Sequence, residues 1–412
     1  MGMLLFRRCN LLDPGSGEYR PNSEILIEGE RIREVSERAI RSESAAVVDV
    51  GGRTVMPGLI DAHIHVYLSE VNLHLLEDVP LTLMAGRAAT LMRAMLDRGF
   101  TTVRDTGGAD FGIREAVETG HLVGPRLFIA GQGISQTGGH GDFRSRTAGP
   151  QTCACCSGVS LISRIVDGVP EMLRAVRDEL RKGADHIKLM VSGGVASPND
   201  PLDSLQFTEA EIAAAVGEAR AWKRYVCAHA YGADAIARAV ACGVRSIEHG
   251  NLIDEPTARL MREKGAFIVP TLVAYDAMRR RGHEFGLPPV SQEKNKIVLE
   301  AGLRSLELCQ AAGVPIGFGS DLLGQLQTDQ SREFLIRAEA MSPLEIIRSA
   351  TLVNARLLQR EGELGVIAPG AFADLLVLDG DPLKDLGLLQ DQGAHLRAIV
   401  KGGAFHKNRL AG

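Results

Sequence analysis

Short apolar runs alternate with stretches of helical periodicity through the middle of the chain. The first run ends at His63, a helical stretch follows at about 81–98, and the same order then repeats. Eight such runs are expected as strands, and most of the gaps between them carry a helical pattern. The later seven lie at 101–105, 126–130, 186–191, 225–230, 246–249, 267–272 and 315–319. Repeated strand-then-helix units predict an α/β fold, a (β/α)8 barrel of the TIM type.

The two ends of the chain have a different pattern, with short β-rich runs separated by Asn, Gly and Pro. Because both ends look alike, we expect them to build one small domain together. The strands expected there are 4–8, 25–28, 31–35, 47–50, 373–378 and 396–400. The prediction is a small β-sandwich domain made of residues 1–58 and 363–412, with the barrel occupying 59–362.

One connection, residues 132–168, is too long for a compact barrel. Loops of that size usually form a lid or a wall of a binding site. This one carries His140 between glycines and a cluster of Cys153, Cys155 and Cys156. Reduced thiols are the expected state of the cluster, and a local disulfide or an adventitious metal site is the alternative.

Composition narrows the class of protein. The chain has 412 residues, 45% of them hydrophobic, and a formal net charge of −5, which suits a soluble globular protein and offers nothing to nucleic acid or an anionic membrane. No apolar stretch reaches the roughly 18 residues that a membrane span needs. The apolar start is too short for a signal peptide, so we expect a cytoplasmic protein.

His63 and His65 lie two residues apart at the end of the first expected strand. Strand side chains repeat every two residues, so both imidazoles lie on one face and make half of a divalent metal site. His229, His249 and Asp321 also fall at strand ends. In a barrel those ends meet at one rim, so four imidazoles and a carboxylate are expected to converge there.

Lys188 lies within the expected strand 186–191. Burial favours the neutral amine of a lysine, and a neutral amine can react with carbon dioxide to give a carbamate with two oxygen donors. The alternative is an ordinary ion pair with a local acid such as Asp185.

This order of His-x-His, Lys, His, His and Asp on eight strand–helix units resembles the amidohydrolase superfamily, in its binuclear subtype with a carboxylated lysine. VMPGLID at 55–61 and GAFADL at 370–375 look like its junctions between barrel and small β domain. A closer likeness is to the prolidase-type (Xaa-Pro) metallo-dipeptidases and the ochratoxin-hydrolysing enzymes. The motifs that carry it are SQTGGH at 135–140, KLMVSGG at 188–194, HAY at 229–231 and IEHGN at 247–251.

The resemblance implies a role for each candidate ligand. His63, His65 and Asp321 would hold the more buried of two divalent ions, and His229 and His249 the second. Carboxylated Lys188 and a hydroxide would bridge them. Histidine and carboxylate ligands suit zinc, manganese and cobalt, and zinc is the expected ion.

The expected reaction is hydrolysis of an amide by the bridging hydroxide, with Asp321 taking the proton and passing it to the leaving nitrogen. His140 and Tyr231 would add hydrogen bonds to the carbonyl oxygen or to the substrate carboxylate, although packing is the alternative for each. Arg144 and Arg146 are further candidates to clamp a carboxylate, since Arg binds carboxylates bidentately, but solvated loop charges explain them better.

The substrate implied by the resemblance is a dipeptide or N-acyl amino acid with a free carboxylate, cleaved to release its C-terminal amino acid. Ochratoxin-type amidase activity and opening of a cyclic amide are alternatives on the same scaffold. Single-metal deamination is disfavoured by Lys188. A non-enzymatic assembly protein is disfavoured because the ligand set is complete. The resemblance also implies a homo-oligomer, with an octamer as one form.

Overall fold

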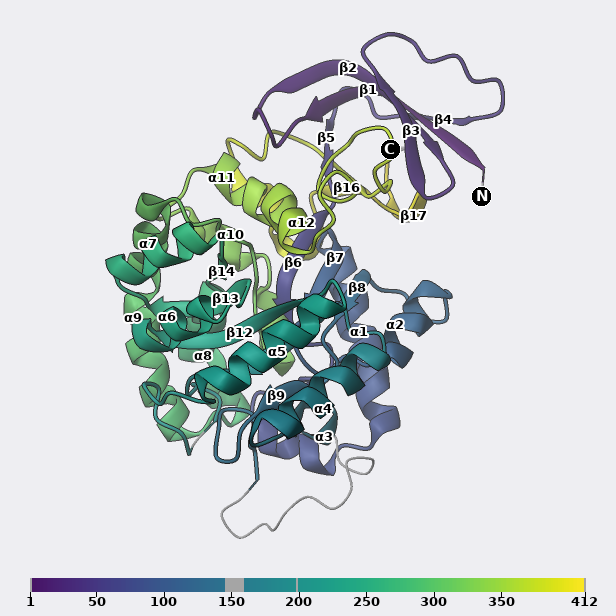
Figure 1. The fold of residues 1–412 in the computed structure, drawn as a ribbon. Coiled ribbons are helices and arrows are strands. Elements are labelled where there is room, and N and C mark those ends of the chain that lie inside the picture. The colour runs from purple at the N-terminus through teal and green to yellow at the C-terminus, as the bar shows by residue number, and fades with distance from the viewer. Residues whose placement is uncertain (1, 145–158, 198, 411–412) are drawn as a thin grey trace.

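The computed structural model describes residues 2–144, 159–197 and 199–410 (Figure 1). The predicted cysteine cluster of Cys153, Cys155 and Cys156, and with it Arg146, lies outside the described residues. Along the described chain, no helix is both long and apolar enough to cross a membrane.

The two ends of the chain share one sheet, where purple and yellow strands lie side by side at the top of Figure 1. Its strands follow the order β17-β16-β15-β5-β1-β2-β3, and β4 pairs with β1. They are β1 (Met3–Leu12), β2 (Tyr19–Glu28), β3 (Arg31–Ser36), β4 (Ala46–Asp49), β5 (Thr54–Pro57), β15 (Leu375–Leu378), β16 (Leu396–Lys401) and β17 (Ala404–Asn408). Both ends of the chain therefore contribute strands to one sheet.

Antiparallel pairing of β5 with β15 joins the two ends, with Val55 opposite Val377. Both side chains are buried in an apolar cluster that also contains Phe6, Ile25 and Val400. The strand β6 (Leu59–Ile64) begins directly after β5, so the small sheet fixes the start of the first central strand.

Parallel strands form the centre of the molecule. One set has the order β6-β7-β8, and a second has the order β10-β9-β11-β12-β13-β14. A bond from the Asp185 amide to the Ile129 carbonyl, 2.8 Å long, connects the two sets. Beyond β6 the strands are β7 (Phe100–Asp105), β8 (Arg126–Ile129), β9 (Gly133–Ser135), β10 (Ser163–Ile165), β11 (His186–Met190), β12 (Tyr225–Gly232), β13 (Ser246–Leu252) and β14 (Phe267–Val269).

The eighth predicted strand, 315–319, is extended chain with a single isolated bridge, from Ile316 to Ile268. It nevertheless bonds both neighbours, since the Gly317 amide donates to Ile268 and the Ala62 amide donates to Phe318, each at 2.8 Å. A Cβ at Gly319 would lie 2.8 Å from the His63 Cβ, so the chain is squeezed between β14 and β6. The prediction of a regular strand there was wrong in extent, because the segment bonds both neighbours but contains a single bridge residue.

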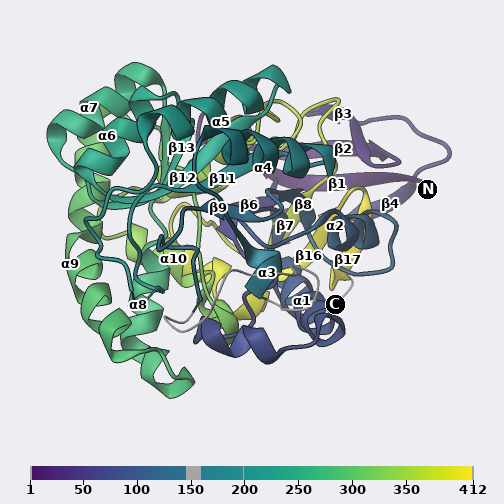
Figure 2. The same ribbon diagram turned by 60° about the horizontal axis from the view of Figure 1, so that its bottom comes forward.

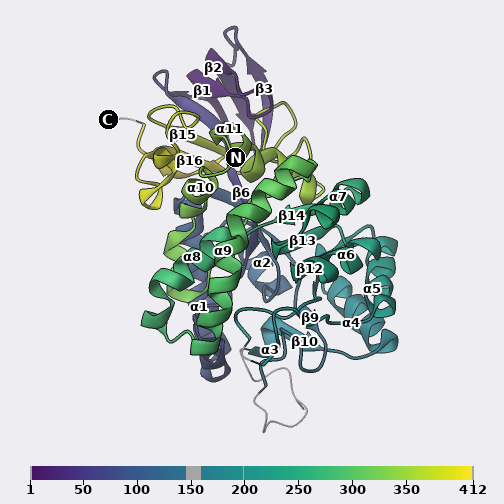
Figure 3. The same cartoon turned by 90° about the vertical axis from the view of Figure 1, so that its left-hand side faces the viewer.

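Helices cover the outside of these strands (Figures 1 and 2). The α-helices are α1 (Leu81–Asp97), α2 (Phe111–Glu118), α3 (Val159–Ile162), α4 (Val169–Arg181), α5 (Glu209–Ala221), α6 (Ala233–Ala241), α7 (Glu255–Lys264), α8 (Leu272–Arg281), α9 (Pro289–Ala312), α10 (Arg332–Arg337), α11 (Pro343–Arg348) and α12 (Asn354–Leu357). The short 3₁₀ turns are η1 (Leu73–Asp78), η2 (Gly282–Phe285), η3 (Gly324–Asp329), η5 (Leu386–Leu389) and η6 (Asp391–Gly393), and η4 (Ser349–Val353) is a π turn. The long helix α9 stands in front in the side view of Figure 3.

The long connection 132–168 is not a plain loop in its described part. It contains β9 and β10, which pair in parallel, and the single turn α3. His140 follows β9, which is hydrogen-bonded to β10 and β11. This part of the predicted wall therefore starts from a strand of the sheet.

Candidate metal centre

His63 and His65 meet the Asp321 carboxylate at the end of β6. Their Nε2 atoms lie 3.4 Å and 3.2 Å from Asp321 Oδ1. Each ring is held through its other nitrogen, since His63 Nδ1 lies 2.8 Å from Glu248 Oε2 and His65 Nδ1 lies 2.7 Å from the Gly107 carbonyl oxygen. Both Nε2 atoms therefore face the same space.

His229 on β12 and His249 on β13 complete the ring of imidazoles. Their ring centroids are 4.6 Å apart, and His249 is 5.0 Å from His63. His249 is anchored through Nδ1 to the Thr271 hydroxyl at 2.8 Å, and it adopts a left-handed φ of 74°. His229 is anchored through Nε2 to the Gly193 carbonyl oxygen at 3.0 Å.

The nitrogen of His249 nearest Asp321 is Nδ1, 3.9 Å from Oδ2, whereas His63 and His65 have Nδ1 engaged by a protein acceptor and Nε2 beside Asp321. Metal-bound histidines show the arrangement of His63 and His65, because the outer bond fixes the tautomer and the ring plane. Donor atoms of His63, His249 and Asp321 all lie within 4.8 Å of one another. The donor set and its supports fit a divalent metal.

Asp321 follows the squeezed extended segment and has a φ of 49°. Its amide donates to the His63 carbonyl at 2.8 Å, so the turn that aims the carboxylate is tied to β6. Burial alone would raise the pKa of Asp321, but His63, His65 and His249 hold that pKa well below its usual range. The carboxylate is therefore ionised and able to ligate a cation.

Lys188 lies on β11, only 1% exposed, with its neighbour Cys227 opposite on β12. The predicted alternative partner, Asp185, is engaged elsewhere: its carboxylate lies 3.3 Å from Arg114 Nη1 and accepts the Ile129 amide. An ion pair with Asp185 is therefore wrong.

A buried ion pair supports the histidines from below. Arg104 Nη2 donates to both carboxylate oxygens of Glu248 at 2.8 Å, and neither side chain is exposed. Burial would raise the pKa of Glu248, but Arg104 and His63 hold that pKa far below its usual range. The ionised Glu248 can accept a hydrogen bond from His63 Nδ1–H, which directs His63 Nε2 toward Asp321.

Sequence reasoning missed Glu248 and Arg104. The only local signal was the acid immediately before His249. The partner on β7 lies 144 residues away, so the pair becomes visible only when the strands are placed side by side.

His140 stacks on His229, with ring centroids 4.2 Å apart and planes 24° apart. Its backbone amide donates to Gln206 Oε1 at 2.9 Å, and its Nδ1 lies 2.6 Å from the Ser197 hydroxyl. Burial lowers the pKa of His140 to about 4, although the Asp200 carboxylate opposes the shift. The ring is therefore neutral near pH 7 and holds one N–H.

Tyr231 is buried beside the same centre, and its ring centroid is 5.2 Å from that of His249. The Tyr275 hydroxyl donates to the Tyr231 oxygen at 3.1 Å, so the hydrogen of Tyr231 is left for another acceptor. Burial raises the pKa of Tyr231 well above its ordinary value, which keeps it a neutral donor.

Arg144 does not serve as a free carboxylate clamp. Its guanidinium makes a two-point pair with Asp142, at 2.7 Å and 2.6 Å. These two bonds occupy the Nε–H and Nη2–H groups that would otherwise bind a substrate carboxylate at two points.

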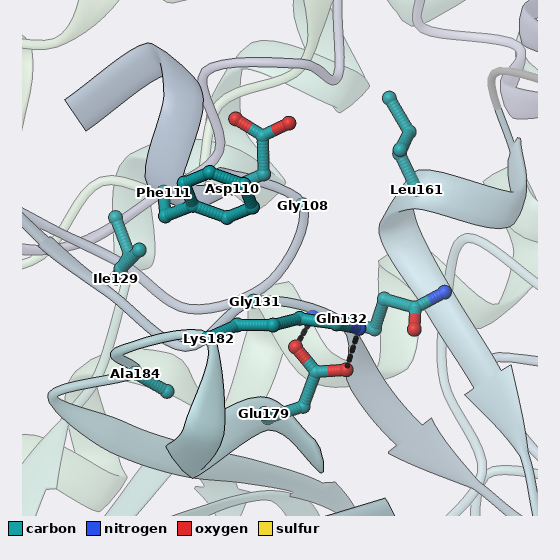
Figure 4. A pocket seen from close by; sticks show the side chains of 10 residues that line it. All are labelled: Gly108, Asp110, Phe111, Ile129, Gly131, Gln132, Leu161, Glu179, Lys182 and Ala184. Carbon is teal, nitrogen blue, oxygen red and sulfur yellow. Dashed lines mark hydrogen bonds and ion pairs between the residues drawn. The ribbon is translucent and has the colours of Figure 1, made fainter. Parts of the chain in front are cut away.

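A separate cavity of about 220 Å³ lies outside the strands, between α2 and the end of α4 (Figure 4). Phe111, Ile129 and Leu161 line it, and the Glu179 carboxylate at its floor accepts the Gln132 amide at 3.3 Å and Lys182 Nζ at 3.1 Å. None of the metal-donor residues lines this cavity. This cavity is therefore separate from the candidate metal centre.

Comparison with known proteins agrees with this fold and site. Residues 54–404 match the amidohydrolase family. The ochratoxinase of Aspergillus niger is 32% identical over 420 aligned positions, which cover 97% of this chain and 86% of that protein. Among solved structures, a prolidase complexed with N-methylphosphonate-L-proline is 51% identical with a TM-score of 0.96, covering 98% of this chain and 100% of that one. A Xaa-Pro dipeptidase with methionine bound in its active site is 30% identical, with a TM-score of 0.87 and coverage of 98% and 100%.

Parallel strands covered by helices, with histidine and carboxylate side chains gathered at the strand ends, are typical of hydrolases with a metal site. The chain belongs to the amidohydrolase family and is a hydrolase that acts on amide bonds. That family is generally metal-dependent, in keeping with the candidate site of His63, His249 and Asp321.

Proposed function

We infer that the chain releases a C-terminal amino acid, proline or a similar residue, from a dipeptide or an N-acyl amino acid. The observation that carries this proposal is the ring of four anchored imidazoles around the ionised Asp321. The 51% identity to a prolidase that binds a proline phosphonate supports the substrate class. Hydrolysis of an ochratoxin-type amide is a second candidate, supported by the 32% identity to ochratoxinase.

We also propose that the central strands and the segment 315–321 close into a (β/α)8 barrel of residues 59–362. The hydrogen bonds from that segment to β14 and β6 support closure. The small sheet would form a β-sandwich domain of residues 1–58 and 363–412.

Two divalent ions are proposed for the centre, with zinc as the expected metal. His63, His65 and Asp321 would hold the more buried ion, and His229 and His249 the other. Lys188 would lose a proton to solvent as its nitrogen bonds the carbon of carbon dioxide, and the resulting carbamate would supply an oxygen to each ion. When bound, such ions polarise a carbonyl and lower the pKa of water so that a nucleophile forms near neutral pH.

Side chains of the protein would then transfer protons and orient the substrate. Asp321 is ionised and lies beside the centre, so it would accept the proton of the nucleophile and deliver it to the leaving nitrogen. Neutral His140 and Tyr231 would donate hydrogen bonds to the carbonyl oxygen as negative charge develops there. Their burial keeps both groups in the donor form near neutral pH.

Replacement of Lys188 tests the proposal. Lys188→Ala should lose both metal ions and reduce hydrolysis below detection, because the bridging donor is gone. The measurements are metal content by mass spectrometry and turnover of Xaa-Pro dipeptides, N-acyl amino acids, ochratoxin A and cyclic amides with zinc present. Lys264→Ala, at a half-exposed position, is the matched control.

The wild type should contain close to two ions per chain and hydrolyse a substrate with a free carboxylate. Full activity in Lys188→Ala would sink the bridging carbamate. Turnover of cyclic amides and of no other substrate would show that the enzyme opens cyclic amides rather than releasing a C-terminal amino acid.

A further inference from the structure

One short stretch of chain supports three of the candidate active-site residues. The Gly193 carbonyl holds His229 Nε2, the Ser197 hydroxyl holds His140 Nδ1, and the Ser192 hydroxyl accepts the Tyr231 amide at 3.1 Å. This stretch follows β11 and is described as residues 191–197 and 199–208, hereafter the β11–α5 loop. Any movement of the loop would displace these side chains together.

The loop closes on the Lys294 ammonium, which comes from α9 about 100 residues further along the chain. Lys294 Nζ donates to the carbonyl oxygens of Gly194 at 2.9 Å, Ser197 at 2.7 Å and Asp200 at 2.5 Å. An ammonium has three N–H donors, so all of them are used by one loop. Asp200 Oδ1, 4.0 Å away, provides the nearby negative charge.

His140 sits against the part of the loop that Lys294 ties together. A Cβ at Gly194 would lie 2.0 Å from the His140 ring, so the glycine backbone forms the seat of that ring. Asp200 Oδ2 accepts the Gly194 amide at 2.9 Å and Gln206 Nε2 at 3.3 Å, while Gln206 Oε1 accepts the His140 amide. The groups around the His140 ring are therefore joined by one network of hydrogen bonds, and the Lys294 ammonium donates into that network.

We propose that Lys294 is a positioning residue of the hydrolytic site, whose ammonium fixes the β11–α5 loop and thereby holds His140 over His229. The proposal rests on the proposed function for its catalytic consequence only. With its three donors consumed, Lys294 is not the clamp for a substrate carboxylate. Its action is mechanical, through three carbonyls that would otherwise have no common partner.

The first test is Lys294→Ala beside Lys296→Ala, an exposed lysine one half-turn further along α9. Hydrogen–deuterium exchange should rise in peptides of the loop and of 136–142 for Lys294→Ala alone. For the preferred amide substrate, kcat should fall about ten- to a hundredfold, because a misplaced donor costs most in the transition state. KM should change less than about threefold. Metal content should equal that of the wild type.

Chemical rescue separates a positioning cation from a general structural role. Propylammonium replaces the atoms that Lys294→Ala removes, so it should restore both the low exchange and at least a tenth of the lost kcat. Tetramethylammonium has no N–H and should restore neither. Lys294→Arg should remain impaired, because a planar guanidinium cannot place three N–H donors at the single point on which the three carbonyl oxygens converge.

Unchanged exchange in Lys294→Ala would overturn the proposal, as would loss of metal that propylammonium does not reverse. If the wild type hydrolyses none of the amides, the proposed function fails. The exchange experiment and its rescue would still decide whether Lys294 orders the loop.

Discussion

Each histidine of the candidate metal centre is held by a partner that lies outside its own sequence motif. Glu248 shows this most clearly, because it is fully buried, binds Arg104 at two points and contacts His63 Nδ1. His63, His65, His229, His249 and Asp321 could be selected as candidates from sequence because each lies at or near a strand end, and Lys188 because it is a lysine within a strand. Their partners could not, since the role of a buried charge becomes clear only when the strand that packs against it is known.

Glu248→Gln should therefore weaken the metal site without removing a ligand. The amide cannot balance Arg104, and it can present its NH₂ to His63, which favours the wrong tautomer. The dissociation constant for zinc should rise about 10–100-fold, and the metal-free protein should melt at a lower temperature because Arg104 is left buried without its counter-charge. Metal titration and thermal unfolding measure both effects.

Glu263→Gln, whose side chain is 72% exposed, is the control and should change neither value. Wild-type zinc affinity in Glu248→Gln would show that His63 is oriented by packing alone.

Elements with a clear period were predictable, and elements shaped by close approach were not. The runs at β7, β8, β11 and β12 carried their apolar signal in a few consecutive residues, and each strand begins within a residue of its predicted start. The segment at Gly317 and Gly319 read as a strand. Its glycines instead mark where the chain packs closely against Val269 on β14 and His63 on β6. Likewise β9 and β10 are three residues each, too short to give a pattern.

The β11–α5 loop offers a test by close packing. Gly194→Ala should push the His140 ring from its seat, since the new Cβ would lie 2.0 Å from it. We expect kcat/KM for the amide substrate to fall about a hundredfold. Gly217→Ala in α5 is the matched control, because no atom lies within 4 Å of the added Cβ. That control should keep full activity and gain about 0.5–1 kcal/mol of stability. Equal activity in both variants would contradict the tight seat.

At the scale of the whole molecule, the junction between the small sheet and the central strands contains a lysine whose charged form is disfavoured by burial. Lys401 on β16 donates to the Gly124 carbonyl at 2.7 Å, and burial, assisted by Arg126, lowers its pKa to about 8 from 10.5. Between these two values the unfolded chain binds a proton that the folded chain does not. The stability contributed by this group therefore rises as pH increases through that window.

Lys401→Met removes this dependence. The melting temperature of the wild type minus that of the variant should become more positive from pH 7.5 to pH 10. Thermal unfolding of both proteins at a series of pH values measures it. A difference that stays constant with pH would show that the ammonium is not penalised by folding.

The pairing of β5 with β15 also sets an order of events on the ribosome. Residues 54–57 emerge long before residues 375–378 are synthesised, so during most of translation that edge of β5 has unpaired amide and carbonyl groups beside apolar side chains. An open edge of this kind invites association between nascent chains. The last strands made are the ones that cover it, and a protein truncated before β15 would keep that edge exposed for its whole lifetime.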